Sequence, residues 1–261
     1  MTERPLTRLR NHRRAARGTP EPFAPVPDIA VPGDVDDGDR AIVERCRPFT
    51  LTSELRVHAL LDAVAYCVER EVPGAFAECG VWRGGSVLAM VLKLRELGVA
   101  DRAVHLYDTF EGMTEPTVHD TSAFSEPALA TWSETRRPGE VAWNALFDPD
   151  VFNEDAVFEL LVDTGYPSEQ IHMVKGPVEQ TLPRDAPDQL ALIRLDTDWY
   201  ESTRHELEHL YPRLSTGGVL IIDDYGHWDG CRRAVDEYFG SVAPPVLLNR
   251  IDYTGRIAVK V

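Results

Sequence analysis

Four aspartates follow two strand-like apolar segments in the second half of the chain. One segment ends directly before Asp196 and Asp198, and a later segment ends directly before Asp223 and Asp224. The carboxyl ends of parallel strands meet at one edge of a sheet, which would bring the four carboxylates together. With no His or Cys among them, these oxygens favour a hard cation such as Mg²⁺ over zinc. The pattern predicts a metal site with a base beside it; the alternative is that these aspartates only cap their loops.

A glycine turn in the first half of the chain predicts a cofactor site. It has the sequence Glu78-Cys-Gly-Val-Trp-Arg-Gly-Gly-Ser86 and follows a short strand-like segment. The glycine spacing is not GxGxxG, and Glu78 would repel a pyrophosphate but attract an ammonium group. Asp108 ends the next strand-like segment, where its carboxylate can accept hydrogen bonds from a ribose diol. The two acids suit S-adenosylmethionine, which carries both groups, although each acid could serve only as a loop cap.

Strand-like and helical segments alternate along the chain and predict an α/β fold with a mainly parallel sheet. Ligands of such sheets bind at the carboxyl ends of the strands, where Glu78, Asp108, Asp196 and Asp223 all fall. We expect strands at 75–80, 103–107, 171–174, 190–195 and 219–222, with closing strands near 246–249 and 256–261. We expect helices at about 53–68, 85–98, 154–163, 199–214 and 231–239.

The chain is predicted to form one domain, residues 39–261, behind an Arg- and Pro-rich extension at 1–38 that is disordered or loosely ordered. Such an extension is typical of a solvated tail that contacts a neighbouring subunit; the alternative is an organellar transit signal. Residues 109–150 interrupt the alternation but carry many aromatic side chains, which a disordered linker would lack. We interpret them as a lid that folds over the site, with a subunit interface as the alternative.

Charge and cysteine content limit the partners and the compartment. The formal net charge of −16 argues against nucleic acid or an anionic membrane as a partner. No apolar run approaches the roughly 18 residues that span a bilayer. The four cysteines form no CxxC pair and lie in apolar or helical stretches, which predicts buried free thiols. We therefore expect a cytoplasmic protein.

Five motifs stand along the chain, at Thr50–Ser53, Glu78–Gly85, Tyr107–Met113, Leu195–Thr203 and Gly217–Tyr225. Together they resemble the macrocin O-methyltransferase (TylF-type) family, over about residues 39–238. The resemblance implies a class I methyltransferase (Rossmann-like) fold, a seven-stranded sheet with its last strand antiparallel. It also implies an S-adenosylmethionine-dependent O-methyltransferase (EC 2.1.1 class) that methylates sugar hydroxyls of bacterial natural products in antibiotic biosynthesis.

The resemblance also implies roles for individual residues. It implies that Asp196, Asp223 and Asp224 hold Mg²⁺ or another hard divalent cation. Asp198 matches the proposed general base, with His227 as the alternative. Members commonly have Gly where this chain has Thr197, a side chain that would alter the loop or the acceptor pocket. The residues expected to bind the methyl donor are Thr50, Ser53, Glu78, Gly80, Trp82, Gly84, Gly85, Ser86 and Asp108.

The predicted reaction is methyl transfer from S-adenosylmethionine to a hydroxyl, on a sugar of a glycosylated bacterial secondary metabolite. A bound cation would orient and activate the acceptor oxygen and an aspartate would take its proton. The expected partners are this small molecule and further copies of the chain, as a dimer or a larger homo-oligomer. Two alternatives are a nicotinamide-dependent reductase on a Rossmann-like sheet, and a catalytically inactive methyltransferase-like assembly or regulatory protein. A reductase would need a phosphate-binding glycine loop, which this chain lacks. An inactive protein would have no reason to keep four carboxylates.

Overall fold

A computed structural model describes residues 35–135, 143, 146–148, 150–241 and 246–261. Residues 1–34 of the predicted extension lie outside the described residues. The first helix, α1 (Asp37–Cys46), begins within the last residues of that predicted extension. Asp36 caps this helix, because its carboxylate accepts a hydrogen bond of 2.7 Å from the backbone N–H of Asp39.

The described residues form a seven-stranded sheet with the strand order β3-β2-β1-β4-β5-β7-β6. β1 to β5 pair in parallel, whereas β7 runs antiparallel to both β5 and β6. The predicted mainly parallel sheet with an antiparallel closing strand is thus confirmed. The last expected strands are shorter than predicted, and the fifth begins earlier. The strands are β1 (Ala75–Cys79), β2 (Val104–Asp108), β3 (Ile171–Lys175), β4 (Leu190–Leu195), β5 (Leu214–Ile222), β6 (Asn249–Arg250) and β7 (Arg256–Val259).

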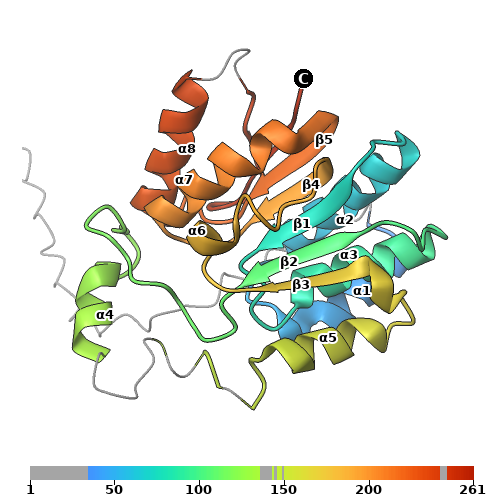
Figure 1. Cartoon of the computed structure of the whole chain (residues 1–261), viewed down its shortest axis with the longest axis horizontal. Helices are drawn as coiled ribbons and strands as arrows, with labels where there is room; N and C mark the ends of the chain where they lie inside the picture. Colours follow the sequence, from blue (N-terminus) through green and yellow to red (C-terminus); the bar gives the residue numbers. More distant parts are fainter. Residues whose placement is uncertain (1–34, 136–142, 144–145, 149, 242–245) are drawn as a thin grey trace, which may run out of the picture.

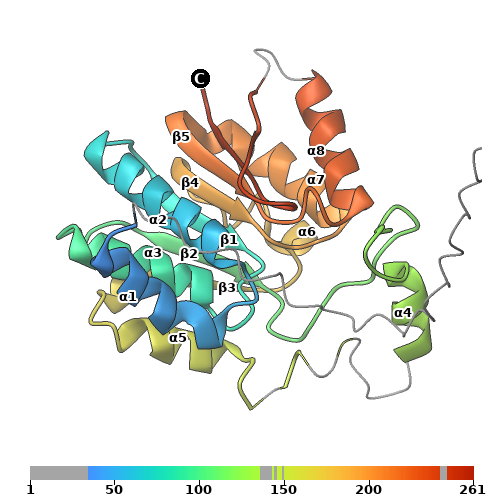
Figure 2. The ribbon, with the colours of Figure 1, turned by 180° about the vertical axis from the view of Figure 1, so that it is seen from behind.

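Helices cover both faces of the sheet (Figures 1 and 2). One face carries α1, α2 (Glu54–Glu69), α3 (Gly85–Glu96) and α5 (Glu154–Val162). The other carries α6 (Val178–Thr181), α7 (Tyr200–His209) and α8 (Asp229–Ser241). The remaining helix, α4 (Ala128–Thr135), belongs to the predicted insertion and stands apart from both layers in Figure 1. Short 3-10 helices lie at Arg47–Phe49, Ser168–Gln170 and Tyr211–Arg213. None of the helices described is long and apolar enough to span a bilayer.

Burial on both faces explains why the central strands are apolar throughout. Successive side chains of a strand point to opposite faces, so neighbouring residues enter different cores. Phe76 and Leu192 pack in the core under α2 and α3, whereas Ala77 and Ile193 pack in the core under α7 and α8. All four cysteines are buried free thiols, as predicted.

The glycine turn after β1 touches the aspartate loop after β4. Gly80 has a φ of +82°, and a Cβ atom on it would lie 1.9 Å from the backbone oxygen of Asp196. The backbone N–H of Asp196 donates to the Cys79 oxygen at 2.8 Å. Only glycine permits this approach, so the two loops that carry the predicted donor and metal sites are fixed against each other.

The start of the insertion is fastened to the N-terminus of α7 by Asp120, which is completely buried. One carboxylate oxygen accepts a hydrogen bond of 2.8 Å from the Tyr200 backbone N–H. The other accepts from the backbone N–H and the hydroxyl of Thr117. A Cβ atom on Gly230 would lie 1.9 Å from Asp120 Oδ1, so α8 leaves room for this carboxylate. Asp120 therefore caps a helix that begins directly after the aspartate loop.

A second set of contacts ties the same segment to α8. The Thr121 hydroxyl donates to Asp229 at 2.9 Å, and the Asp229 backbone N–H donates to the Thr121 oxygen at 2.8 Å. The indole N–H of Trp199 donates to the Thr114 oxygen at 3.0 Å. Residues 114–121 are thereby part of the folded domain.

Replacing Asp120 by alanine should reduce stability more than an ordinary surface substitution. The change leaves the N–H groups of Tyr200 and Thr117 without acceptors, which should cost about 2–3 kcal/mol of unfolding free energy. Urea unfolding would measure it, with Asp188→Ala as the control because that side chain is fully exposed. Equal stability of the two variants would show that Asp120 does not anchor the insertion.

Candidate active site

A cavity of about 950 Å³ opens at the carboxyl ends of the parallel strands. Glu78, Asp108 and Asp196, which follow or end three of these strands, line its floor. Trp143 and Phe147 of the predicted lid also line it. The cavity is therefore bounded both by the strand ends and by the insertion.

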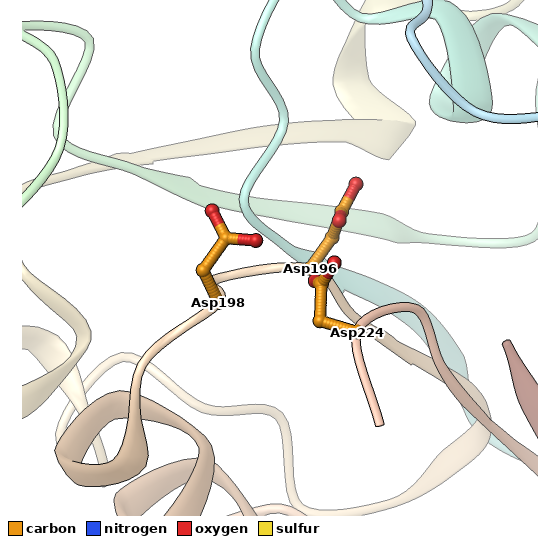
Figure 3. Close-up of side chains that lie close together, drawn as sticks. All are labelled: Asp196, Asp198 and Asp224. Carbon is orange, nitrogen blue, oxygen red and sulfur yellow. The ribbon is translucent and has the colours of Figure 1, made fainter. Parts of the chain in front are cut away.

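Three aspartates meet in this cavity (Figure 3). Asp196 and Asp198 lie on the loop after β4, and Asp224 follows β5. One oxygen from each carboxylate lies within 4.8 Å of the other two. A hard cation prefers such an oxygen-rich set, so we call these residues the carboxylate cluster.

The electrostatics of the carboxylate cluster also suit a cation. Burial raises the pKa of Asp198, and the negative charge of Asp196 adds to this effect. Burial likewise raises the pKa of Asp224, with Asp198 as the next cause. Asp224 Oδ2 is buried and has no hydrogen-bond partner among the described residues. A divalent cation would relieve the repulsion and satisfy this oxygen, so the residues fit a hard metal ion.

Asp223 lies outside the cluster, although it was predicted to be a ligand. Its carboxylate forms ion pairs with the guanidinium groups of Arg56 and, at 2.5 Å, Arg194. All three side chains are buried. Asp223 and Asp224 alternate in direction at the end of β5, so only one of the two joins Asp196 and Asp198.

Arg194 connects the carboxylates at the ends of three strands. Its Nη1 donates to Glu78 at 2.5 Å and to Asp196 at 2.7 Å. Its Nη2 donates to Asp223 at 2.5 Å and to the Thr52 hydroxyl at 2.8 Å. The residue is only 1% exposed. Burial alone would lower the pKa of Arg194, but Asp196 and Glu78 outweigh burial and raise it. The guanidinium therefore stays charged and fixes these acids in relation to one another.

Glu78 has one oxygen free for a ligand. Oε1 accepts from Arg194, whereas Oε2 is buried without a hydrogen-bond partner among the described residues. Burial raises the pKa of Glu78 to about 8, although Arg194 opposes the shift. An ammonium group would supply the missing partner and favour the carboxylate. Glu78 thus fits the charged amino group of S-adenosylmethionine.

Asp108 lines the cavity and also holds the glycine turn. Its Oδ2 accepts from the backbone N–H groups of Val81 and Trp82 at 2.7 and 2.9 Å, and its Oδ1 accepts from Phe110 at 2.8 Å. Burial raises the pKa of Asp108, while these N–H groups act in the opposite direction. Both lone pairs of Oδ2 are thus used, whereas Oδ1 has a further lone pair that a ribose hydroxyl could use.

Among the other residues predicted for the methyl donor, Gly84 does not line the cavity, whereas Ser53 and Trp82 line it and also bond to neighbouring residues. Gly84 contacts α5 instead of the cavity, because a Cβ atom on it would lie 3.0 Å from Val157. Ser53 caps α2 and donates to Asp252 at 2.7 Å, and the Trp82 indole donates to the Leu146 oxygen at 2.8 Å. The predicted residues that line the cavity, besides Glu78 and Asp108, are Thr50, Ser53, Gly80, Trp82, Gly85 and Ser86.

His227, the alternative base, also lines the cavity. Its Nδ1 lies 3.1 Å from the Tyr253 hydroxyl, and its ring stacks on Phe124 at a centroid distance of 5.6 Å. Burial lowers its pKa, and the positive charge of Arg56 acts in the same direction. A neutral imidazole is therefore favoured at this position.

Sequence reasoning missed the cationic half of the site. Arg194 stands within the apolar run of β4, and a charged residue there could have signalled a buried ion pair. Arg56 and Asp252 gave no comparable signal, because they approach the strand ends from α2 and from the loop after β6.

Comparisons with known proteins agree with the fold and show the family. Residues 33–258 match the macrocin O-methyltransferase (TylF) family. The chain is 39% identical, over 75% of its length and 70% of the relative's, to the 8-demethyl-8-(2,3-dimethoxy-alpha-L-rhamnosyl)-tetracenomycin-C 4'-O-methyltransferase of Streptomyces olivaceus. It is 36% identical, over 68% of its length and 64% of the relative's, to the demethyldecarbamoylnovobiocin O-methyltransferase of Streptomyces niveus.

A solved structure shares the architecture. The O-methyltransferase NovP superposes with a TM-score of 0.68 at 30% sequence identity, covering 82% of each chain. The match agrees with the class I methyltransferase fold predicted above. With the family match over most of its length, the chain belongs to the macrocin O-methyltransferase family and is an O-methyltransferase.

Proposed function

We propose that the chain transfers a methyl group from S-adenosylmethionine to a sugar hydroxyl of a glycosylated bacterial natural product. One observation carries the proposal: a single cavity is lined both by Glu78, which has an unpartnered oxygen, and by three converging carboxylates. The two relatives named above support a sugar or natural-product acceptor and a place in antibiotic biosynthesis.

The donor end of the cavity would bind through Glu78, Asp108 and the glycine turn. Glu78 would accept a hydrogen bond from the ammonium group, and Asp108 would accept one from a ribose hydroxyl. Gly80 and Gly85 let the backbone turn pass beneath the ligand. S-adenosylmethionine carries the methyl group on a sulfonium. When the methyl group is transferred, the sulfur leaves as a neutral thioether.

The acceptor end would use the carboxylate cluster. Asp196 and Asp224 hold Mg²⁺, and Asp198 beside them takes the proton of the acceptor hydroxyl. When bound, the cation stabilises negative charge on that oxygen. The position of Asp198 supports its role as proton acceptor, because it lines the cavity beside the two proposed cation ligands.

Alignment and exclusion of water complete the proposed mechanism. The acceptor oxygen forms a bond to the methyl carbon as the carbon–sulfur bond breaks, and the hydroxyl proton passes to Asp198. Trp143 and Phe147 of the insertion line the cavity and would shield this displacement from water. We therefore propose that the insertion predicted at 109–150 acts as the lid of the site; its residues 136–142, 144–145 and 149 lie outside the described residues.

Glu78→Gln should weaken binding of S-adenosylhomocysteine, measured by isothermal titration calorimetry. Loss of a charge-assisted hydrogen bond costs about 1.5–3 kcal/mol, or roughly 10- to 100-fold in affinity. Glu126→Gln is the matched control, because Glu126 also lines the cavity but is exposed. If the wild type binds no S-adenosylhomocysteine, the proposed donor site is wrong.

Substitutions of the aspartates should separate cation binding from stability. Asp196→Asn and Asp224→Asn should each weaken Mn²⁺ binding at least about 100-fold, because each removes a charged ligand. Asp223→Asn should instead lower the unfolding free energy by about 3–5 kcal/mol, because it breaks buried ion pairs with two arginines. Mn²⁺ titration followed by electron paramagnetic resonance, with parallel urea unfolding, measures both effects. A stable Asp223→Asn variant that has lost Mn²⁺ binding would return Asp223 to the ligand set.

The general base can be identified with any glycoside that the wild type methylates. Asp198→Asn should lower kcat about 100-fold or more but weaken Mn²⁺ binding no more than about tenfold. His227→Gln should keep most of the activity. The reverse ranking of the two variants in a radiolabelled methyl-transfer assay would make His227 the base.

A further inference from the structure

The loop that carries Asp196 and Asp198 contains a tight turn of unfavourable geometry. Asp198 has a φ of +67°, in the left-handed region that favours glycine. The Trp199 N–H donates to the Thr197 oxygen at 2.7 Å, which closes a turn of only three residues. Such a conformation costs free energy for an aspartate, so the surrounding structure must hold it. We call residues 196–199 the aspartate turn.

A side-chain hydrogen bond beneath the aspartate turn meets this requirement. The Thr197 hydroxyl donates to Glu206 Oε1 at 2.9 Å, and Glu206 lies one and a half helical turns into α7. Glu206 is 0% exposed, and its second oxygen has no hydrogen-bond partner among the described residues. Burial raises the pKa of Glu206 well above its usual range, so the neutral acid is favoured.

Burying a carboxyl group costs free energy unless the group is hydrogen-bonded or paired with a charge. No ion pair with Glu206 occurs among the described residues, so Coulomb attraction does not hold it there. Its Oε1 accepts a hydrogen bond from Thr197, the residue between the two aspartates. The bond also fixes the direction of Thr197, whose hydroxyl points to α7 although the residue borders the cavity.

We propose that Thr197 and Glu206 form a brace that holds the aspartate turn, so that Glu206 is a positioning residue for cation binding. The brace ties the middle of the turn to α7, and the Ser202 hydroxyl adds a bond of 3.3 Å to the Thr197 oxygen. Without the brace, the turn relaxes toward an ordinary φ, and Asp196, a proposed cation ligand on the same turn, moves with Asp198 away from Asp224. This inference rests on the proposed cation site, but the brace itself can be measured without a metal.

The first experiment measures the turn directly. Amide hydrogen exchange of the segment containing Trp199 should accelerate at least about tenfold in Thr197→Val and in Glu206→Leu. Glu206→Gln should exchange at the wild-type rate, because its amide oxygen can still accept from Thr197. Glu208→Leu is the matched control on the same helix, where Glu208 is exposed and pairs with Arg204 at 2.9 Å. Unchanged exchange in both brace variants would overturn the proposal.

The second experiment measures the consequence, as Mn²⁺ affinity of the full chain. Loss of a group that orients metal ligands typically costs about 10- to 100-fold in affinity, which we expect for Thr197→Val and Glu206→Leu. The double variant should be no weaker than either single variant, because both act through one bond. Thr197→Val is nearly isosteric, so it should remove the hydrogen bond without misfolding the protein. A thermal melt would check that the variant is folded.

The outcomes separate this inference from the proposed function. Faster exchange with unchanged Mn²⁺ affinity would overturn the positioning role of Glu206. The positioning role would also be overturned if Glu206→Gln bound Mn²⁺ as weakly as Glu206→Leu. The brace needs only a hydrogen-bond acceptor, which glutamine supplies. If the wild type binds no Mn²⁺, the proposed cation site and the positioning role both fail, while the exchange rates still decide whether the brace exists.

Discussion

The buried guanidinium of Arg194 is the interaction on which the site depends. Glu78, Asp196 and Asp223 would repel one another at the carboxyl ends of β1, β4 and β5 if no cation lay between them. A planar guanidinium has five donors, so one residue can bond to all three carboxylates and to Thr52 as well. The proposed donor and acceptor ends of the cavity thus share a single buried positive charge.

This arrangement relates the composition of the site to its chemistry. Arg194 and Arg56 neutralise the buried acids that lie against the sheet, whereas Asp198 and Asp224 have no arginine partner among the described residues. The uncompensated charge is therefore concentrated in the carboxylate cluster, where the proposed cation would bind. Burial without a counterion raises the pKa of Asp198 and Asp224, and a bound cation would lower it again.

Backbone contacts set the distance between the two ends of the cavity. Gly80 brings the turn after β1 against Asp196, and Asp120 holds the insertion against the first N–H of α7. The aspartate turn lies between these two contacts. It is consequently restrained from the sheet, from the insertion and, through Glu206, from the helix that follows it. Such redundancy is what a left-handed aspartate requires, because its own backbone preference opposes the observed conformation.

The sequence by itself determined the order of the strands along the chain, the helices α2, α3, α5, α7 and α8, the mainly parallel sheet and the edge at which the candidate site lies. It did not predict α1, α4 or α6. Apolar runs that end in acids, such as those before Asp196 and Asp223, carry this information locally, because parallel strands present their carboxyl ends together. Tertiary structure decided which acid has which partner. Asp223 and Asp224 are neighbours in the chain, yet one pairs with Arg56 and Arg194 and the other faces Asp196 and Asp198. Those arginines, and the Glu206 beneath Thr197, come from separate elements, and their directions depend on packing that no local pattern records.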